Sequence, residues 1–283
     1  MTSTPEAPEE HTPESGAVSQ GPPGADVTPG ETLLSLRGIS KSFGPVQAIQ
    51  NIDLDVPAGQ VTALIGDNGA GKSTLIKTIS GIWTPSSGHI YWSGKEVHIH
   101  TPRDATELGI ATVYQDLALC DNLDIVENLY LGHEATRLGV LDEIEMELTT
   151  NKTLKDLAVS TVKSVRQKVG SLSGGQRQAV AVARAVMRDS KLVILDEPTA
   201  ALGVSQTAQV INLIQTLASR GVAVVVISHN LTDVFEVADR VAVMYLGALV
   251  SSGPVQNYDT GSAVDLITTG VTSRAPSTLA TAQ

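Results

Sequence analysis

The chain has little cysteine, few aromatic residues and no long apolar run. Cys120 is the single cysteine among 283 residues, which excludes an intrachain disulfide and fits a reducing compartment. The longest apolar run, VAVVVI at 222–227, has the length of a strand, whereas a membrane helix needs about 20 apolar residues. The opening residues, MTSTPEAPEEHTPES, contain neither a basic region nor an apolar stretch, so we expect no signal peptide.

Basic residues are scarce as well. The formal net charge is −11, and residues 1–30 contribute five carboxylates and no Lys or Arg, which leaves −6 for the rest of the chain. A broad nucleic-acid footprint needs a basic patch. The charge balance therefore predicts no nucleic-acid partner.

Aliphatic residues dominate the remainder and point to an α/β fold. The chain is 42% hydrophobic and only 3% aromatic. Continuous aliphatic runs are typical of buried parallel strands covered by helices. Residues 1–30 hold six of the 13 prolines and are predicted to form a disordered acidic tail. Residues 31–258 are expected to form the folded domain, followed by a C-terminal segment, 259–283, whose last dozen residues are also expected to be disordered.

The periodicity predicts the order of the elements. ETLLSLRGIS (31–40) and IQNIDLDVP (49–57) alternate, as antiparallel strands with one exposed face do. VTALIG (61–66) is a buried strand, 73–81 a helix with Gly81 as its C-cap, and 87–99 a hairpin around Ser93-Gly94. Residues 117–184 read as helical and more polar. Two buried strands, 191–198 and 221–229, flank a helix at 205–220, and two short strands follow at 240–253. The helical stretch is thus predicted to interrupt a parallel-sheet core.

GDNGAGKST, Gly66 to Thr74, matches the phosphate-binding pattern G-x-x-x-x-G-K-[ST]. It follows an apolar strand and opens a helix, which is the context the pattern requires. The glycines let backbone N–H groups surround a phosphate chain at a helix N-terminus. Lys72 is expected to reach the outer phosphates, and the Ser73 hydroxyl to bind Mg²⁺.

Three further apolar strands are followed by polar residues. Asp196 and Glu197 end LVILDE; Asp196 is expected to hold Mg²⁺, and Glu197 to act as general base toward the attacking water. Gln115, in TVYQD, could ligate Mg²⁺ and position that water, although a lone Gln is ordinarily a surface amide. His229 ends another strand and could donate a hydrogen bond to the γ-phosphate, although a lone His at such a point is usually structural.

Five motifs in order carry a family resemblance. GDNGAGKST, Gln115, LSGGQRQ, LVILDEP and ISH resemble the motif set of ATP-binding-cassette (ABC) ATPases. Ser173 follows Lys72 by 101 residues, Asp196 follows Ser173 by 23, and His229 follows Asp196 by 33. The resemblance covers about 33–253. It implies an α/β P-loop fold with a parallel-sheet core, an antiparallel β-subdomain and a helical subdomain at about 117–185.

The resemblance also implies roles for single residues. Phe43 would stack on adenine, Gln115 would couple the nucleotide to a membrane partner, and His229 would be the switch histidine. The phosphate loop, which would bind ATP with Mg²⁺, consists of Gly66, Asp67, Asn68, Gly69, Ala70, Gly71, Lys72, Ser73 and Thr74. The signature consists of Ser173, Gly174, Gly175 and Gln176.

The signature LSGGQ lacks any acid, base or metal ligand. In the family it does not touch the ATP of its own chain but closes over ATP held by a second ATPase domain arranged head to tail. Ser173 is expected to cap the helix that follows, so that backbone N–H groups form an anion site. The chain has one complete motif set, so a homodimer is the simplest way to make two sites.

Sequence segments around the motifs indicate a subgroup within the family. DEPTAAL, TVYQDLALCDNLDIVENLYLG and SGKEVHIHTPRDATELGI resemble bacterial monosaccharide importers of the ribose, xylose and fructose kind. After DEPTAAL many ABC proteins have Asp where this chain has Gly203, which puts tight coupling between the two ATP sites in doubt. The resemblance implies a peripheral subunit on the cytoplasmic face, served by a permease and indirectly by an extracytoplasmic sugar-binding protein.

Two other functions stay open at this point. One is a soluble ABC ATPase acting on nucleic acid or ribosomes; such proteins usually carry two cassettes or long coiled-coil insertions, which this chain lacks. The other is an exporter ATPase, which only the subgroup wording argues against. Three residues outside the motifs have structural interpretations: His98 and His100 alternate on an expected strand without a third metal ligand, and Cys120 is expected to be buried or half-buried near Gln115.

Overall fold

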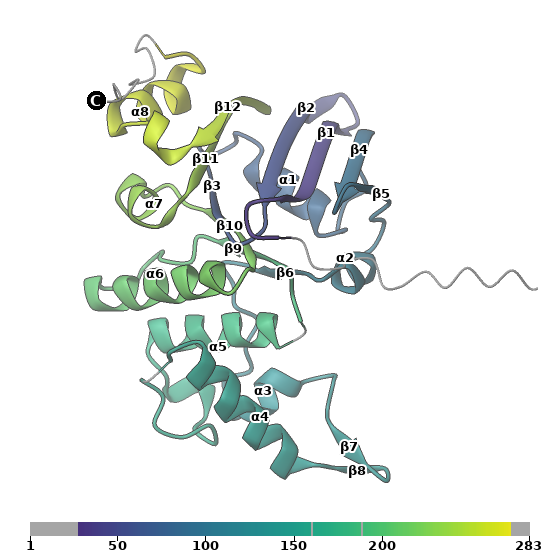
Figure 1. Cartoon of the computed structure of the whole chain (residues 1–283), viewed down its shortest axis with the longest axis vertical. Coiled ribbons are helices and arrows are strands. Elements are labelled where there is room, and N and C mark those ends of the chain that lie inside the picture. The colour runs from purple at the N-terminus through teal and green to yellow at the C-terminus, as the bar shows by residue number, and fades with distance from the viewer. Residues whose placement is uncertain (1–27, 160, 188, 273–283) are drawn as a thin grey trace, which may run out of the picture.

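The computed structural model describes residues 28–159, 161–187 and 189–272. At its centre lies a six-stranded sheet in the order β12-β11-β3-β10-β9-β6 (Figure 1). Its strands are β3 Val61–Gly66, β6 Ile110–Val113, β9 Leu192–Asp196, β10 Ala223–Ile227, β11 Arg240–Tyr245 and β12 Ala248–Pro254. Five run parallel, and β12 pairs antiparallel with β11 at the edge. Every residue of β3 and β10 is buried, as their continuous aliphatic sequences predict.

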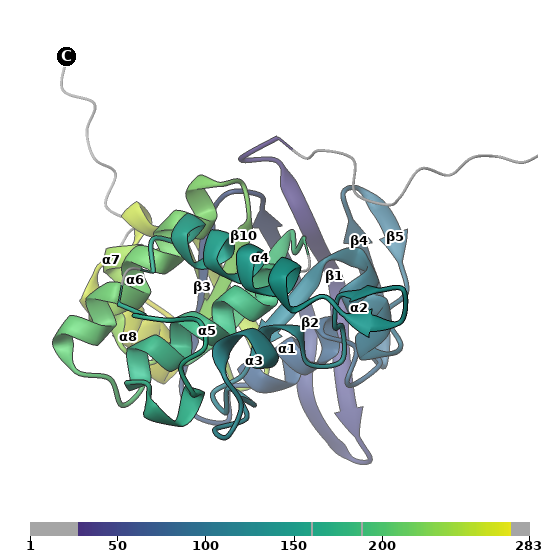
Figure 2. The ribbon, with the colours of Figure 1, turned by 90° about the horizontal axis from the view of Figure 1, so that it is seen from below.

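A second, antiparallel sheet in the order β2-β1-β4-β5 lies on one side of the central sheet, and α6, α7 and α8 lie on the other (Figure 2). Its strands are β1 Thr32–Phe43, β2 Val46–Pro57, β4 Ser87–Trp92 and β5 Lys95–Val97. Ser93 and Gly94 join β4 to β5 with φ of 49° and 76°, which confirms the predicted hairpin. Leu34, Ile52 and Trp92 from this sheet share one core with Leu64 and Leu75, which lie before and after the glycine-rich loop.

The helices follow the predicted order. They are α1 Lys72–Ile79, α2 Pro102–Leu108, α3 Ile125–Tyr130, α4 Glu143–Asp156, α5 Gly174–Val186, α6 Val204–Ser219, α7 Leu231–Val237 and α8 Thr260–Thr269, with 3₁₀ turns at Val169–Ser171 and Val255–Asn257. Helices α3, α4 and α5 group below the central sheet, within the stretch predicted to be helical (Figure 1). The sequence did not predict the small hairpin of β7 Thr136–Arg137 and β8 Val140–Leu141, because two-residue strands are too short to show alternation.

Two local predictions were off by a few residues. Helix α1 ends with Ser80 as its C-cap, and Gly81 follows in the left-handed conformation with φ of 74°. A Cβ at Gly81 would lie 2.2 Å from the carbonyl oxygen of Thr101, so the glycine is required by packing as well as by φ. Strand β5 ends at Val97, so His98 and His100 lie beyond it; their rings nevertheless stack at 6.1 Å.

The predicted tails fall mostly outside the described residues, at 1–27 and 273–283. Helix α8 lies within the predicted C-terminal segment and packs against β11. Among the described residues, none of the helices combines the length and apolar character needed to span a membrane.

Candidate functional site

Four polar loops meet at one edge of the central sheet. The glycine-rich loop follows β3, Asp196 ends β9 and Glu197 comes directly after it, His229 follows β10, and Gln115 follows β6. These strands are consecutive neighbours in the sheet and run parallel. Their carboxyl ends therefore lie at the same edge, where α/β sheets place ligands. The sheet order brings together residues that lie up to 163 positions apart in the sequence, between Gly66 and His229.

The glycine-rich loop presents unpaired donors. Gly71 is the N-cap of α1, with φ of 99° and no side-chain cap. Within the described chain the N–H groups of Gly69, Gly71 and Lys72 have no protein acceptor. A Cβ at Gly71 would lie 2.7 Å from Ile49 Cγ2, so only glycine fits. The loop lines a cavity of 450 Å³, and free N–H groups at a helix N-terminus suit an anion of phosphate type there.

Lys72 lies buried in this loop. Its Nζ donates to the carbonyl oxygens of Gly66 at 2.8 Å and Asp67 at 3.0 Å. Burial lowers the pKa of Lys72, against the attraction of Glu197, Asp67 and Asp196, which raises it. The Lys72 ammonium group thus lies between the loop and the carboxylates at the end of β9. A phosphate chain bound there would replace the two carbonyl groups as its electrostatic partner.

Asp196 and Glu197 occupy different environments although they are adjacent. Burial, and then repulsion by Glu197, raise the pKa of Asp196, while Lys72 pulls it down. Glu197 has φ of 51°, a left-handed conformation that non-glycine residues rarely adopt. Its backbone N–H donates to the Ile227 carbonyl at 2.9 Å, and its Oε2 lies 2.8 Å from Nδ1 of His229. Backbone strain of this kind occurs preferentially at functional sites.

Replacing Asp196 by Asn is expected to raise the melting temperature of the nucleotide-free protein at neutral pH. Folding raises the pKa of Asp196, so above the folded-state pKa the ionised carboxylate lowers the free energy of unfolding. This penalty decreases as the pH falls from the folded-state pKa toward the unfolded-state pKa, where it is lost. The gain should therefore shrink toward acid pH. Thermal unfolding between pH 4 and 8 measures it, with Glu236→Gln at an exposed position of α7 as control. If Asp196→Asn melted at a lower temperature than wild type at pH 7, the predicted destabilisation by the ionised Asp196 would be wrong.

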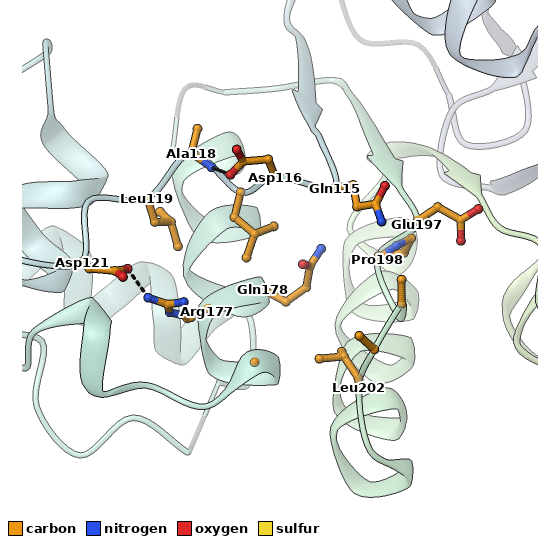
Figure 3. A pocket seen from close by; sticks show the side chains of 14 residues that line it. Gln115, Asp116, Ala118, Leu119, Asp121, Arg177, Gln178, Glu197, Pro198 and Leu202 are labelled. Atoms are coloured by element: carbon orange, nitrogen blue, oxygen red, sulfur yellow. Dashed lines mark hydrogen bonds and ion pairs between the residues drawn. The ribbon is translucent and has the colours of Figure 1, made fainter.

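A second cavity of 560 Å³ opens between the segment after Gln115, the start of α5 and the loop after β9. Gln115 and Glu197 stand at one end of it, and Asp121 and Arg177 at the other (Figure 3). Gln115 thus lies at the same end of the cavity as Glu197, the carboxylate predicted to act on the attacking water. Its side chain makes no hydrogen bond in the described structure, which leaves the amide available.

Two arginines that the sequence reasoning missed tie this segment to α5. Arg177 pairs with Asp121 (Figure 3), and Arg184 donates to the carbonyl oxygens of Leu117 and Ala118, both at 2.8 Å. The two arginines are seven residues apart and therefore share a helix face. That spacing was the available signal in the sequence. Because of these contacts, the Gln115 segment is linked directly to the helix that carries the signature.

Ser173 of the signature caps the helix that follows it, as predicted. Ser173 is the N-cap of α5: Gln176 N–H donates to Ser173 Oγ at 3.4 Å, and Ser173 N–H donates to Gln176 Oε1 at 2.9 Å. The glycines have a second purpose inside the chain. A Cβ at Gly174 would lie 2.8 Å from Leu202 Cδ2, and one at Gly175 would lie 3.1 Å from Gln206 Cβ. The start of α5 therefore packs closely against Leu202 and against Gln206 of α6.

The signature does not line the cavity of its own glycine-rich loop; Gly174 lines the second cavity instead. Phe43 is not among the residues that line the loop cavity either, although Val46 and Gln47 are. Its ring is 41% exposed; it meets Trp83 edge-on at 4.7 Å, and Lys41 Nζ lies over it at 5.3 Å from the centroid. The adenine-stacking role of Phe43 stays a prediction.

The residues expected to hold Mg²⁺ fit that ion chemically. Ser73, Gln115 and Asp196 offer a hydroxyl, an amide oxygen and a carboxylate, which are the oxygen donors Mg²⁺ prefers. No group of three His, Cys, Asp or Glu residues that could hold a metal occurs in the described part of the chain. A sparse oxygen set is typical of Mg²⁺ that completes its shell with water and substrate phosphates.

Comparisons with known proteins agree with this geometry. The family model described as "ABC transporter" matches residues 49–200. The fructose import ATP-binding protein FrcA of Rhizobium meliloti is 44% identical over 245 residues, 84% of this chain and 94% of that one. The xylose/arabinose import ATP-binding protein XylG of Sulfolobus acidocaldarius is 45% identical over 218 residues, 77% and 86% of the two chains. An ABC transporter cassette solved in its ADP conformation matches with a TM-score of 0.72 and 27% identity, over 84% and 95% of the two chains.

Proposed function

The chain belongs to the ABC transporter family of ATP-binding proteins, and on that basis we propose that it hydrolyses ATP to drive import of a monosaccharide through a membrane permease. The observation that carries the proposal is the convergence of the glycine-rich loop, Asp196, Glu197 and His229 on neighbouring parallel strands. Free N–H groups, a buried lysine and a carboxylate–histidine pair there provide what phosphoryl transfer to water requires.

The chain's own residues divide the work. N–H groups of the loop and Lys72 Nζ bind and orient the phosphates, at the cost of the two carbonyl contacts that Lys72 now makes. Glu197 Oε2 accepts a proton from, or polarises, the attacking water, and His229 holds this carboxylate in place and reaches toward the γ-phosphate. Mg²⁺, when bound by Ser73, Asp196 and Gln115, neutralises charge on the phosphates.

Each nucleotide site needs a second subunit to be complete. Ser173 and Gly174 stand away from the glycine-rich loop of their own chain, yet they form a capped helix N-terminus suited to an anion. A head-to-tail partner would bring its signature over this chain's loop. A homodimer needs no further gene product, because this chain has the full motif set. The movement that closes the dimer on ATP would then be transmitted to the permease through Gln115 and through Arg177 and Arg184 of α5.

The substrate class rests on the relatives. FrcA and XylG, at 44% and 45% identity, are named for import of fructose and of xylose or arabinose. We propose a monosaccharide for this transporter as well, delivered by an extracytoplasmic binding protein and recognised by the permease. The chain itself would lie peripherally at the cytoplasmic face of the membrane.

The test is reconstitution of this chain with the permease that copurifies with it, in liposomes with a candidate sugar-loaded binding protein. ATP hydrolysis stimulated by one monosaccharide complex is the expected result. Stimulation by RNA or DNA instead, with no copurifying permease, would support the nucleic-acid function and overturn this proposal.

Gly203→Asp is expected to couple the two ATP sites more tightly. Gly203 is the N-cap of α6 at φ −76°, and nothing lies within 4 Å of a Cβ built there. Asp therefore fits without strain and caps the helix, for a gain of a few tenths of a kcal/mol over Gly. The ATP dependence of hydrolysis should show a higher Hill coefficient. Gly203→Ala, which fits equally but cannot cap, is the control; a rise with Ala would contradict the prediction.

A further inference from the structure

A buried carboxylate, Asp233, lines neither cavity of the ATP site and has no part in the function proposed above. It belongs to the first turn of α7, the helix that follows His229. Its Oδ2 accepts a hydrogen bond of 2.7 Å from Oγ1 of Thr199, which lies in the loop after β9. Two segments 34 residues apart therefore meet at this contact, and each of them also carries a residue of the proposed hydrolysis step.

The start of α7 leaves Asp233 available for this contact. Asp233 is the third residue of the helix, where an acidic side chain often turns back to accept the N–H of the N-cap residue. Here the N-cap residue is Asn230, and its N–H donates to Ser228 Oγ at 3.0 Å instead. A buried carboxylate needs a hydrogen-bond donor, and the hydroxyl of Thr199 provides one.

The loop after β9 needs support because its backbone is strained at two positions. Glu197 has φ of 51° and Ala201 has φ of 60°, both in the left-handed region that non-glycine residues rarely adopt. Strained backbone persists only where the surrounding contacts hold it in place. Thr199 lies midway between the two strained residues, so its hydrogen bond to Asp233 is placed where it can hold the loop in the conformation of Glu197.

Two side-chain contacts in the described structure join this loop to the segment after β10, and they differ in exposure. In the contact between Glu197 and His229, the histidine side chain is 72% exposed. Exposed ion pairs contribute little to stability because water screens them. A hydrogen bond to a charged acceptor contributes more where water is excluded, and Asp233 is only 9% exposed. The buried contact therefore anchors the loop, whereas the exposed pair can rearrange when phosphate and water bind.

We propose that Asp233 is a positioning residue for ATP hydrolysis. Through Thr199, it holds the loop in the conformation that presents the Glu197 carboxylate to the attacking water. Neither Asp233 nor Thr199 lines a cavity of the site, so both act on the reaction through Glu197. This inference rests on the proposed function, because it names a residue on which the general base depends.

Thr199→Val tests the proposal, because valine has nearly the shape of threonine and lacks the hydroxyl. We expect kcat for ATP hydrolysis to fall roughly 10- to 100-fold, as it does when a catalytic group is displaced. KM and the dissociation constant for ATP should stay at their wild-type values, since the phosphate loop and Lys72 are untouched. Thr199→Ser, which keeps the hydroxyl, should retain most of the wild-type rate.

Variants of Asp233 identify the interaction. Asp233→Asn keeps an oxygen that can accept from Thr199, so it should retain most of the wild-type kcat. Asp233→Ala should lose as much activity as Thr199→Val, and the double variant should lose no more than either single one.

The Glu197→Gln background shows through which residue the contact acts. Single-turnover hydrolysis by Glu197→Gln should not fall further when Thr199→Val is added, because the side chain that the loop positions is already lost. A purely structural role of Thr199 would slow both backgrounds by the same factor.

Ser251→Ala is the control for a general loss of stability. Ser251 Oγ shares a hydrogen bond of the same length, 2.7 Å, with the Tyr258 hydroxyl at β12, the edge strand of the central sheet. Its loss should lower the melting temperature and leave kcat unchanged. All rates are measured well below the lowest melting temperature in the set, so that every variant is folded.

The outcomes separate this inference from the proposed function. Wild-type kcat in Thr199→Val and Asp233→Ala, with the wild type itself hydrolysing ATP, would overturn this inference alone. An equal further loss in the Glu197→Gln background would also overturn it, because the contact would then act on something other than Glu197. Loss of activity in Asp233→Asn but not in Thr199→Val would assign Asp233 to the N-terminus of α7 instead of the loop. A wild-type chain that hydrolyses no ATP would overturn the proposed function and this inference with it.

Discussion

Glu197→Gln is expected to lower kcat for ATP hydrolysis by roughly 10²–10⁴-fold, which is what loss of a general base typically costs. Gln has nearly the same shape as Glu and can keep the left-handed turn and a hydrogen bond to His229. It cannot accept the proton of the attacking water. ATP binding should therefore survive, since the loop and Lys72 are untouched.

The variant should also accumulate as an ATP-bound dimer. If closure follows binding and opening follows hydrolysis, slow hydrolysis leaves the closed state populated. Size-exclusion chromatography with ATP and Mg²⁺ measures this, and single-turnover hydrolysis measures the rate. Glu236→Gln, the same change at an exposed position of α7, is the matched control. Near-wild-type hydrolysis by Glu197→Gln would remove Glu197 from the role of general base.

Ser173→Arg is expected to abolish dimer closure and to reduce hydrolysis by roughly 10²–10³-fold, comparable to the loss of one preorganised anion donor. Ser173 lies at the first turn of α5, away from the loop that binds ATP in its own chain. ATP binding to the isolated subunit should therefore be nearly intact. Equilibrium ATP binding, sedimentation and steady-state hydrolysis together distinguish these effects.

The structure shows that this variant needs a second comparison. Ser173 Oγ caps α5, and loss of an N-cap costs about 1 kcal/mol by itself. Ser173→Ala removes the cap without adding bulk, and Ser173→Asn keeps a cap. Closure should survive in Ser173→Asn and in folded Ser173→Ala. If Ser173→Ala abolished closure as fully as Ser173→Arg, helix capping rather than the interface would explain the result.

Sequence reasoning was strongest where chemistry needs a fixed local order. Only glycine fits at Gly71, and a helix must follow at once, so the phosphate loop is visible as a pattern in the chain. The β4–β5 hairpin was predictable for the same reason, since Ser93-Gly94 sets its turn. The family, the ATPase activity and the capping of α5 by Ser173 followed from such local rules.

Contacts between distant segments were not visible in this way. Arg184 bonds carbonyl groups 66 and 67 residues away, and backbone carbonyl groups leave no trace in a sequence. The packing of Gly175 on Gln206 is equally hidden, because a glycine in a motif has a sufficient explanation without it. The hairpin at 136–141 was missed because its strands are shorter than one period of alternation.

The sequence by itself thus determined where the glycine-rich loop lies, which carboxylates follow the strands and to which family the chain belongs, because these depend on residues adjacent in the chain. Tertiary structure decided what surrounds them. Sheet order placed Glu197 beside His229, burial raised the pKa of Asp196, and the fold left Leu138 fully exposed. Burial and proximity are properties of the packed chain, since both depend on segments that meet only after folding.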